Sequence, residues 1–329
     1  KITSILAAFL AATSAFATTS DVVGYTTTTL PGGAGNIFAP AFVNADSFAG
    51  AISEASSGAT STLTVSGTLS SGAFDETTDV SFVSKGYPQY YVEVLNDTNS
   101  GDGLDTEGLI IDIVSNTDSA VVVGVDTSSL GVQGDEDIAI RKHITLASLF
   151  ANSTGLTAYT DVITIYNEDG AGTAVSHLPD GTGGFVSNAD FTTVTSDAPV
   201  YPGTGFVINN PSAVTITPVG TVKESDTQVV IYGGSVVNIV GCLKPVSSFD
   251  MASDGRLGDA LVDYTDVCTP YSTDGNLTAG TTFLDNGASA FVSGVDFFTP
   301  ITASVDGTSD ALVVSAGSGT VYKASGNSL

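Results

Sequence analysis

The chain contains nearly the same phrase twice, "YTDVITIYNEDG" at residues 159–170 and "YTDVCTPYSTDG" at residues 264–275, 105 positions apart. In each, a short run rich in Val, Ile and Thr comes before an Asp-Gly pair, which is typical of a strand that ends in a tight turn. A second shared phrase follows each, "FVSNADF" from Phe185 and "FVSGVDF" from Phe291, offset by 106. Two matches in the same order at nearly equal offset predict a duplicated β domain, and the period is too long for a solenoid.

Other features of the two copies agree with this interpretation. A short segment with helical spacing comes before each phrase, "TLASLF" at 145–150 and "RLGDALVD" at 256–263. A looser echo closes each copy, "PGTGFVI" from Pro202 and "AGSGTVY" from Ala316, in which the second copy lacks the Phe. We therefore expect β repeat domain 1 at 143–222 and β repeat domain 2 at 223–329.

The region before the repeats also consists of short alternating runs. Strand-like segments of five to eight residues are separated by Gly, Pro, Asn and Asp, as in "DVSFVSKGYPQYYVEVL" and "GLIIDIVSNTDSAVVVGVD". Regular spacing of this kind predicts a small antiparallel barrel or sandwich over residues 18–142. The predicted fold class is all-β, with this N-terminal domain followed by two duplicated antiparallel β domains.

The first 17 residues, "KITSILAAFLAATSAFA", are typical of a secretory signal peptide. They have a basic start, an apolar run and a small-x-small ending at Ala15-Phe16-Ala17, which predicts cleavage before Thr18. The apolar run is too short for a membrane span, and no second long apolar run follows. We expect an exported protein, extracellular or at the cell surface, without a transmembrane helix.

The charge balance restricts the partners. There are 35 Asp and Glu against 8 Lys and Arg, a net charge of −27. Nucleic acids and anionic lipids require basic patches, so neither is expected as a partner. Cations are the natural counterpart of such a chain, and a solvated acidic surface suited to salty surroundings needs no specific site at all.

Motifs of catalysis are missing from the sequence. The two histidines, His143 and His177, have no partner at metal-ligand spacing, and there is no Cys/His cluster or Gly-x-Ser-x-Gly elbow. "PGGAGN" has neither a P-loop lysine nor a following helix. Carboxylate pairs for glycoside hydrolysis are too numerous to single one out, and sugar-stacking tryptophans are absent. The sequence therefore predicts a protein that is not an enzyme and has no certain cofactor.

One loop has the composition of a calcium site. "NDTNSGDGLDTEG" from Asn96 places oxygen-bearing side chains around flexible glycines, as hard cations require. It is not an EF-hand, because Gly108 stands where that motif has its closing Glu. The other interpretation is a polar hairpin loop without a ligand. The candidate calcium ligands are Asp97, Asn99, Asp102, Asp105 and Glu107.

The two cysteines, Cys242 and Cys268, suit an oxidising compartment. A disulfide between them would close a loop of moderate length and stabilise the fold by roughly 3 kcal/mol. Two buried free thiols are the alternative. Since export is expected, the sequence favours the disulfide.

Several phrases in this order resemble the uncharacterised exported proteins of the Verrucomicrobia. They are "DVVGYTTTTLPGG", "YYVEVLND", "GLIIDIVSNTDSAVVVGVD", "TLASLF" and "GTGFVINN", which together extend over most of the chain after the signal peptide. The resemblance implies an exported, β-rich protein, and it implies no activity, cofactor or catalytic residue.

Three functions fit these features. The first is a secreted, non-enzymatic structural protein of the cell surface or extracellular matrix that forms homo-oligomers or polymers through β-strand edges. The second is an adhesin module that binds glycans or another surface molecule through an aromatic platform of Tyr87, Tyr90 and Tyr91. The third is an outer-membrane β-barrel, against which the repeat and the missing terminal aromatic argue.

Overall fold

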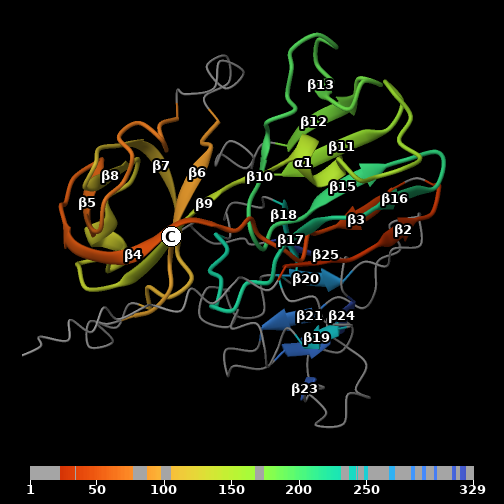
Figure 1. Cartoon of the computed structure of the whole chain (residues 1–329). Coiled ribbons are helices and arrows are strands. Elements are labelled where there is room, and N and C mark those ends of the chain that lie inside the picture. Colours follow the sequence, from red (N-terminus) through yellow and green to blue (C-terminus); the bar gives the residue numbers. More distant parts are fainter. Residues whose placement is uncertain are drawn as a thin grey trace, which may run out of the picture.

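The computed structural model describes residues 23–33, 35–76, 87–97, 105–166, 174–230, 237–241 and 243, together with short strands between 248 and 323. This part of the chain is almost entirely β, so the all-β prediction is confirmed (Figure 1). Within it, no helix combines the length and the apolar character needed to cross a membrane.

Six antiparallel strands close into a barrel, so of the barrel or sandwich predicted upstream of the repeats the structure has the barrel (Figure 1). Their order around the barrel is β4-β5-β8-β7-β6-β9, and a 3-10 helix, η1 (Thr127–Leu130), joins β8 to β9. The strands are β4 (Asp46–Ala55), β5 (Ser61–Ser66), β6 (Tyr90–Val94), β7 (Ile110–Asn116), β8 (Ala120–Val123) and β9 (Asp137–Lys142).

Alternation of apolar and polar residues determines which side chains fill the barrel. In β5, Leu63 and Val65 point inward and are buried, whereas Thr62 and Ser66 are exposed. The interior is packed with aliphatic side chains from the other strands, so it is a core and not a channel. Register shifts in β4 and β7 mark β-bulges, which bend these strands and help the sheet to close.

A five-stranded antiparallel sheet, the first sheet, lies beside the barrel with the order β13-β12-β11-β15-β3 (Figure 1). A second hydrophobic core, centred on side chains such as Phe38, Ile163 and Phe206, packs against it. The strands are β3 (Asn36–Phe38), β11 (Val162–Tyr166), β12 (Ala174–Pro179), β13 (Phe185–Ser187) and β15 (Phe206–Asn209), and β10 (Ile144–Thr145) pairs with β14 (Pro199–Val200) nearby.

The short helix expected at 145–150 is present as α1 (Leu146–Phe150). It begins at a capping box, in which the Thr145 side chain accepts a hydrogen bond from the backbone of Ser148 and the Ser148 side chain bonds back. Leu146, Leu149 and Phe150 are buried in the core of the first sheet. Its expected counterpart at 256–263 lies outside the described residues.

The strands before the barrel belong with the strands after it. β1 (Val23–Tyr25) pairs with β17 (Val219–Thr221), β2 (Thr28–Leu30) pairs with β16 (Val214–Ile216), and β3 pairs with β15. The expected division at residue 142 therefore differs from the observed one, because the first three strands complete the sheet of the following segment. Pairing across about 190 residues leaves no local pattern in the sequence, so the boundary was misplaced.

The barrel is inserted into the first sheet unit between β3 and β10. Its first and last strands are neighbours, and Asp46 lies opposite Arg141 in their ladder. The chain thus enters and leaves the barrel at one place, as it does in inserted domains.

The C-terminal strands form a second sheet with the order β18-β25-β20-β21-β22-β23. Read from β22, the order β22-β21-β20-β25-β18 corresponds strand by strand to β13-β12-β11-β15-β3, and the pair β19-β24 corresponds to β10-β14. A duplicated unit would produce this shared order. The strands are β18 (Val237–Gly241), β19 (Ser248–Asp250), β20 (Val267–Pro270), β21 (Phe283–Asp285), β22 (Phe291–Ser293), β23 (Pro300–Ile301), β24 (Val313–Ser315) and β25 (Gly319–Lys323).

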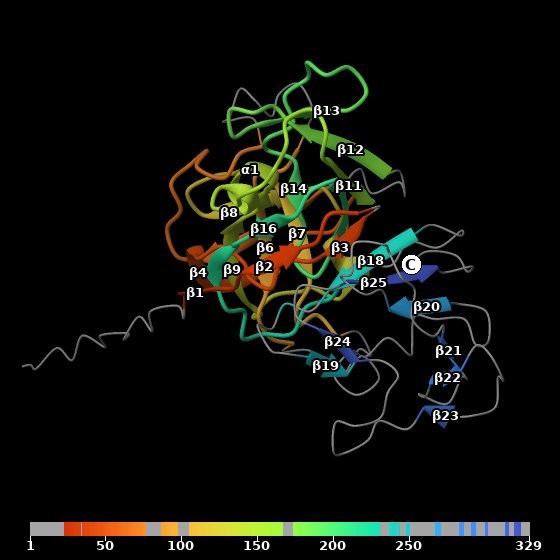
Figure 2. The same cartoon turned by 90° about the vertical axis from the view of Figure 1, so that its right-hand side faces the viewer.

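The spacing of the matching strands indicates that the barrel is an insertion into the first of the two units. Asn36-Ile37 of β3 and Asn238-Ile239 of β18 are 202 residues apart, whereas the Tyr-Thr-Asp-Val phrases are 105 apart. The excess of 97 residues equals the span 46–142 of the barrel. The two sheets meet where the Gly205 N–H donates to the Ile239 carbonyl (2.9 Å), with β3, β18 and β25 close together (Figure 2).

Candidate functional site

The loop predicted to bind calcium connects β6 to β7 at one end of the barrel. Of its candidate ligands, Asp97, Asp105 and Glu107 are described, whereas Asn99 and Asp102 lie outside the described residues. Asp97 Oδ1 accepts a hydrogen bond from Thr106 Oγ1 (3.5 Å), and Asp105 Oδ1 accepts one from the Glu107 backbone N–H (3.2 Å). Within the described ranges, no three His, Cys, Asp or Glu side chains are grouped as metal ligands would be. Calcium binding stays a prediction.

The same loop holds the segment that follows β17. Gln228 Nε2 donates to the carbonyls of Asp105 (2.5 Å) and Glu107 (3.0 Å), and the Asp226 N–H donates to Glu107 Oε1 (3.4 Å). The Gln228 N–H also donates to the Gly108 carbonyl (3.0 Å). In the structure, two of the candidate ligands therefore help to attach residues 226–228 to the barrel.

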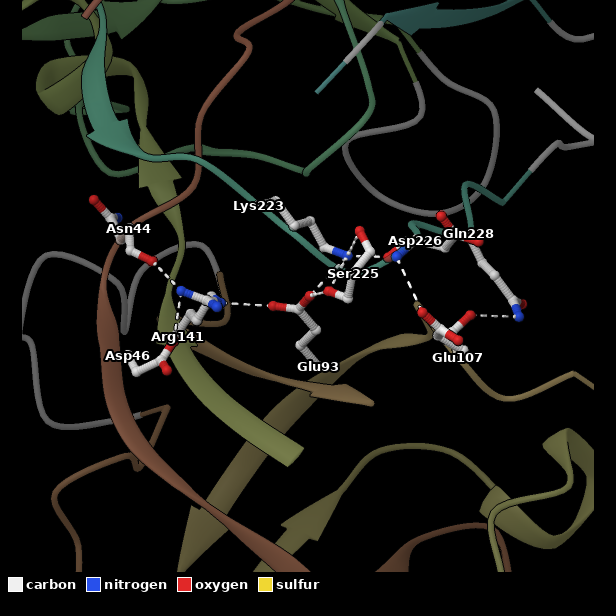
Figure 3. Close-up of polar contacts among 9 residues, drawn as sticks. All are labelled: Asn44, Asp46, Glu93, Glu107, Arg141, Lys223, Ser225, Asp226 and Gln228. Atoms are coloured by element: carbon white, nitrogen blue, oxygen red, sulfur yellow. Dashed lines mark hydrogen bonds and ion pairs between the residues drawn. The ribbon is translucent and has the colours of Figure 1, made fainter. Parts of the chain in front are cut away.

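An ionic group, the junction cluster, continues this attachment (Figure 3). Glu93, Arg141 and Lys223 are its buried members, and Asp46 and Ser225 lie at its more exposed ends. The fully buried Glu93 carboxylate lies 2.6 Å from Arg141 Nε through Oε2 and 2.7 Å from Lys223 Nζ through Oε1. Ser225 Oγ donates to Glu93 Oε1 (2.6 Å), and Arg141 also contacts Asp46 (2.5 Å). The cluster joins β4, β6 and β9 of the barrel to residues 223–225.

Each charge in the junction cluster depends on the others. Burial raises the pKa of Glu93, but Lys223, Ser225 and Arg141 more than offset this, so the pKa lies below its usual value. Burial lowers the pKa of Lys223, and a carboxylate shared with Arg141 compensates for this only in part. Since its three central charges, Glu93, Arg141 and Lys223, are buried and paired with one another, we assign the cluster a structural role.

A cleft of about 820 Å³ lies between the barrel, the first sheet and β18. One wall is the outer face of β7 on the barrel. The other walls come from β11 and β12 of the first sheet, the turn before β15, residues 228–230 and β18. Ligand sites are typically concave, mostly apolar and located between structural units, and this cleft has all three properties.

A hydrogen-bonded trio lies at the wall of the cleft. Asp112 projects from the outer face of β7, between the inward-pointing Ile111 and Ile113. Its Oδ2 accepts a hydrogen bond from the Tyr201 hydroxyl (2.7 Å), and its Oδ1 lies 3.0 Å from His143 Nε2. The His143 ring is buried, with ring centroids 4.7 Å from Tyr91 and 4.9 Å from Tyr201. The Asp112 side chain is held in place and still 38 % exposed.

A second carboxylate, that of Glu76, faces the same cleft. Partial burial and the negative charge of Asp112 together raise its pKa. The cleft therefore holds two acids that repel each other.

The three tyrosines of the expected aromatic platform are dispersed. Tyr87 lines the cleft, whereas the Tyr90 ring packs on Phe74 (5.1 Å between centroids) and Tyr91 is buried. Alternation within β6 accounts for this, since neighbouring residues of a strand face opposite sides. Tyr166 and Tyr201, which the sequence did not single out, join Tyr87 in the cleft.

The remaining predicted residues lie elsewhere. His177 is buried in β12, opposite Ile163 and Ser187. Cys268 is part of β20 and Cys242 lies outside the described residues, so the disulfide stays a prediction.

The chain matches no known family model, no curated protein and no solved structure at a significant level, so the resemblance to exported Verrucomicrobia proteins stays a prediction.

Proposed function

We propose that this is a secreted, non-enzymatic structural protein of the cell surface or extracellular matrix that assembles with copies of itself through a β-strand edge. The feature that carries the proposal is the edge strand, which we define as residues 23–30, containing β1 and β2. It pairs with residues 214–221 on one side, and no described strand pairs with its other side.

The register shows which backbone groups point outward. Thr221 exchanges both backbone hydrogen bonds with Val43, and Thr215 does so with Thr154. Their partners across the ladder, Val23 and Thr29, therefore direct their own N–H and C=O groups away from it. By alternation, residues 23, 25, 27 and 29 all present backbone donors and acceptors to a neighbouring strand.

The side chains of the edge strand do not prevent pairing. Val23, Tyr25, Thr27 and Thr29 are exposed, and Val219 beside them is 51 % exposed. Natural edges are commonly blocked by Lys, Pro or bulges, and the edge strand has none of these. In a chain with a net charge of −27, an uncharged ribbon is also where two copies repel each other least.

Light scattering and negative-stain images of the chain from Thr18 onward test the proposal. We expect ordered oligomers, and we expect Tyr25→Lys with Thr27→Lys to leave monomers, because like charges would face each other across the new pair. The matched control is Thr62→Lys with Ser66→Lys, which adds the same charge on the barrel strand β5, whose two sides pair with β4 and β8. Monomers of the unmodified chain, or equal assembly of both variants, would contradict the proposal.

Calcium is tested in the same assay. The loop from Asp97 to Glu107 would bind weakly, as extracellular sites do, so samples with chelator are compared with samples in about 1–10 mM calcium. Assembly that requires calcium and disappears with Asp105→Asn would support the predicted site. Equal assembly in both conditions would remove calcium from the proposal.

The alternative, a module that binds glycans or another surface molecule, is favoured by Tyr87, Tyr166 and Tyr201 in the cleft. It predicts a monomer that binds specific spots on a glycan array, and a monomer that binds none would exclude the glycan form of this alternative.

A further inference from the structure

The cleft beside β7 has the size of a ligand site and lies between structural units. Its volume of about 820 Å³ falls within the range of about 300–1,000 Å³ that is usual for small-molecule sites. It is formed by segments from the barrel, the first sheet and the segment that leads to β18, so it exists only when these parts are assembled.

The walls of the cleft carry unusually exposed apolar side chains. Val114 is 38 % exposed, Val125 41 % and Val230 64 %, and all three line the cleft. A gathering of this kind is stabilised when an apolar molecule covers it. The occupant therefore has an apolar body.

The polar groups of the cleft determine the charge of the occupant. Among the described lining residues, the charged side chains are Glu76 and Asp112, both acidic, and neither Lys nor Arg is present. An anionic ligand would be repelled by them and by the net charge of the chain. A cation would be attracted by both carboxylates and would reduce their mutual repulsion.

The aromatic residues favour the same charge. Tyr87, Tyr166 and Tyr201 line the cleft, and tyrosine rings attract cations through their negative faces. Tyr201 also fixes the Asp112 carboxylate by donating to Oδ2 (2.7 Å), while His143 lies at Oδ1 (3.0 Å). Asp112 is thus held in a fixed position before any ligand arrives, which lowers the entropy cost of binding.

We propose that this cleft binds an organic cation, an amine or quaternary ammonium group on an apolar body, with Asp112 and Glu76 as its counter-ions. The site is independent of the edge strand, which is formed by different residues. A failure of self-assembly therefore leaves this inference standing, and its own failure leaves the assembly proposal standing.

Three probes of nearly equal shape separate charge from apolar contact: 4-phenylbutylamine, 4-phenylbutanol and 4-phenylbutyrate, each titrated calorimetrically into the full chain. We expect the amine to bind about tenfold more tightly than the alcohol, and the carboxylate more weakly than the alcohol. Equal affinity of amine and alcohol, or no binding of the amine, would overturn the proposal.

Variants locate the site. Asp112→Asn keeps the shape of the side chain and is expected to reduce amine affinity about tenfold while leaving the alcohol unchanged. Glu76→Gln is the second variant and avoids the contacts with Tyr201 and His143. The control is Asp118→Asn, at an exposed carboxylate in the turn between β7 and β8 that does not line the cleft. An equal loss in the control variant would mean that only the net charge matters.

The pH dependence gives an independent readout. Because the pKa of Glu76 is raised, its carboxylate takes up a proton at a higher pH than usual. Amine affinity should therefore decline as the pH falls toward and through that raised value, and Glu76→Gln should remove this part of the decline. A flat affinity profile for the unmodified chain would contradict the role of Glu76.

Discussion

Glu93 is a single buried carboxylate that faces two cations, Arg141 and Lys223. Removing this charge is costly, because Lys223 would stay buried without a carboxylate partner. The junction cluster therefore makes the position of residues 223–225 on the barrel depend on one side chain.

Glu93→Gln should lower the free energy of unfolding by about 3–5 kcal/mol, since Lys223 would lose its carboxylate partner and Arg141 would keep only Asp46. Lys223→Met should cost less, because Glu93 keeps Arg141. Denaturant unfolding measures both, with Glu54→Gln, an exposed residue of β4, as a control that changes stability by less than about 0.5 kcal/mol. A Glu93→Gln chain as stable as the control would refute the structural role of the cluster.

The pH dependence of this effect has a definite sign. The folded-state pKa of Glu93 is depressed, so its stabilisation is complete above the unfolded-state value near 4.5 and is lost as the pH falls through the folded-state value. The stability difference between the unmodified chain and Glu93→Gln should therefore be constant at neutral pH. It should shrink in acid as the pH falls below the unfolded-state pKa and through the folded-state pKa of Glu93. A difference that grows in acid would assign the effect to another group.

At the scale of elements, β1 and β17 lie against Phe42 and Val43 through two glycines opposite each other, Gly24 and Gly220. A Cβ at Gly220 would lie 2.6 Å from the Val43 carbonyl oxygen and 2.9 Å from Phe42 Cβ. Because Gly24 and Gly220 have no side chains, β1 and β17 can pack closely against Phe42 and Val43.

Gly220→Ala should destabilise the chain by roughly 1–3 kcal/mol, because the backbone must shift to relieve the contact. It should also weaken self-assembly, since the edge strand would lose its support. Gly124→Ala is the matched control, because its Cβ would meet only the Val114 side chain at 3.5 Å, an ordinary contact. Thermal unfolding compares the two variants. Equal melting temperatures would show that β1 and β17 tolerate the backbone shift without loss of stability.

At the scale of the whole molecule, the barrel is an insertion with its own core and with adjacent entry and exit strands. We expect residues 44–143 expressed separately to fold cooperatively, since both strands of every barrel ladder are present. The fragment should be less stable than the barrel in the full chain, because Glu93 would have lost Lys223 and Ser225. Circular dichroism during heating measures this, and the lack of a cooperative transition would show that the barrel needs the sheet.

Local patterns of apolar and polar residues were sufficient to predict the strands and α1, because these depend on neighbours in the sequence. They left a barrel and a sandwich open, because closure of the barrel depends on pairing between β4 and β9, which are far apart in the sequence. The return of β1, β2 and β3 to strands at 206–221 was not predictable, since nothing local in the edge strand identifies its partner. The cleft was missed for a similar reason. Asp112, His143 and Tyr201 come from three separate segments, and only the fold brings them together.

The adjacent ends of the barrel have a mechanical consequence. If copies join through residues 23–30, tension between them enters each molecule at that strand and passes straight to residues 214–221, with which it pairs. The chain leaves this path near residue 43 and comes back near residue 144, at one place. The barrel therefore lies beside this path, and a load that passes between the paired strands does not run through the barrel core.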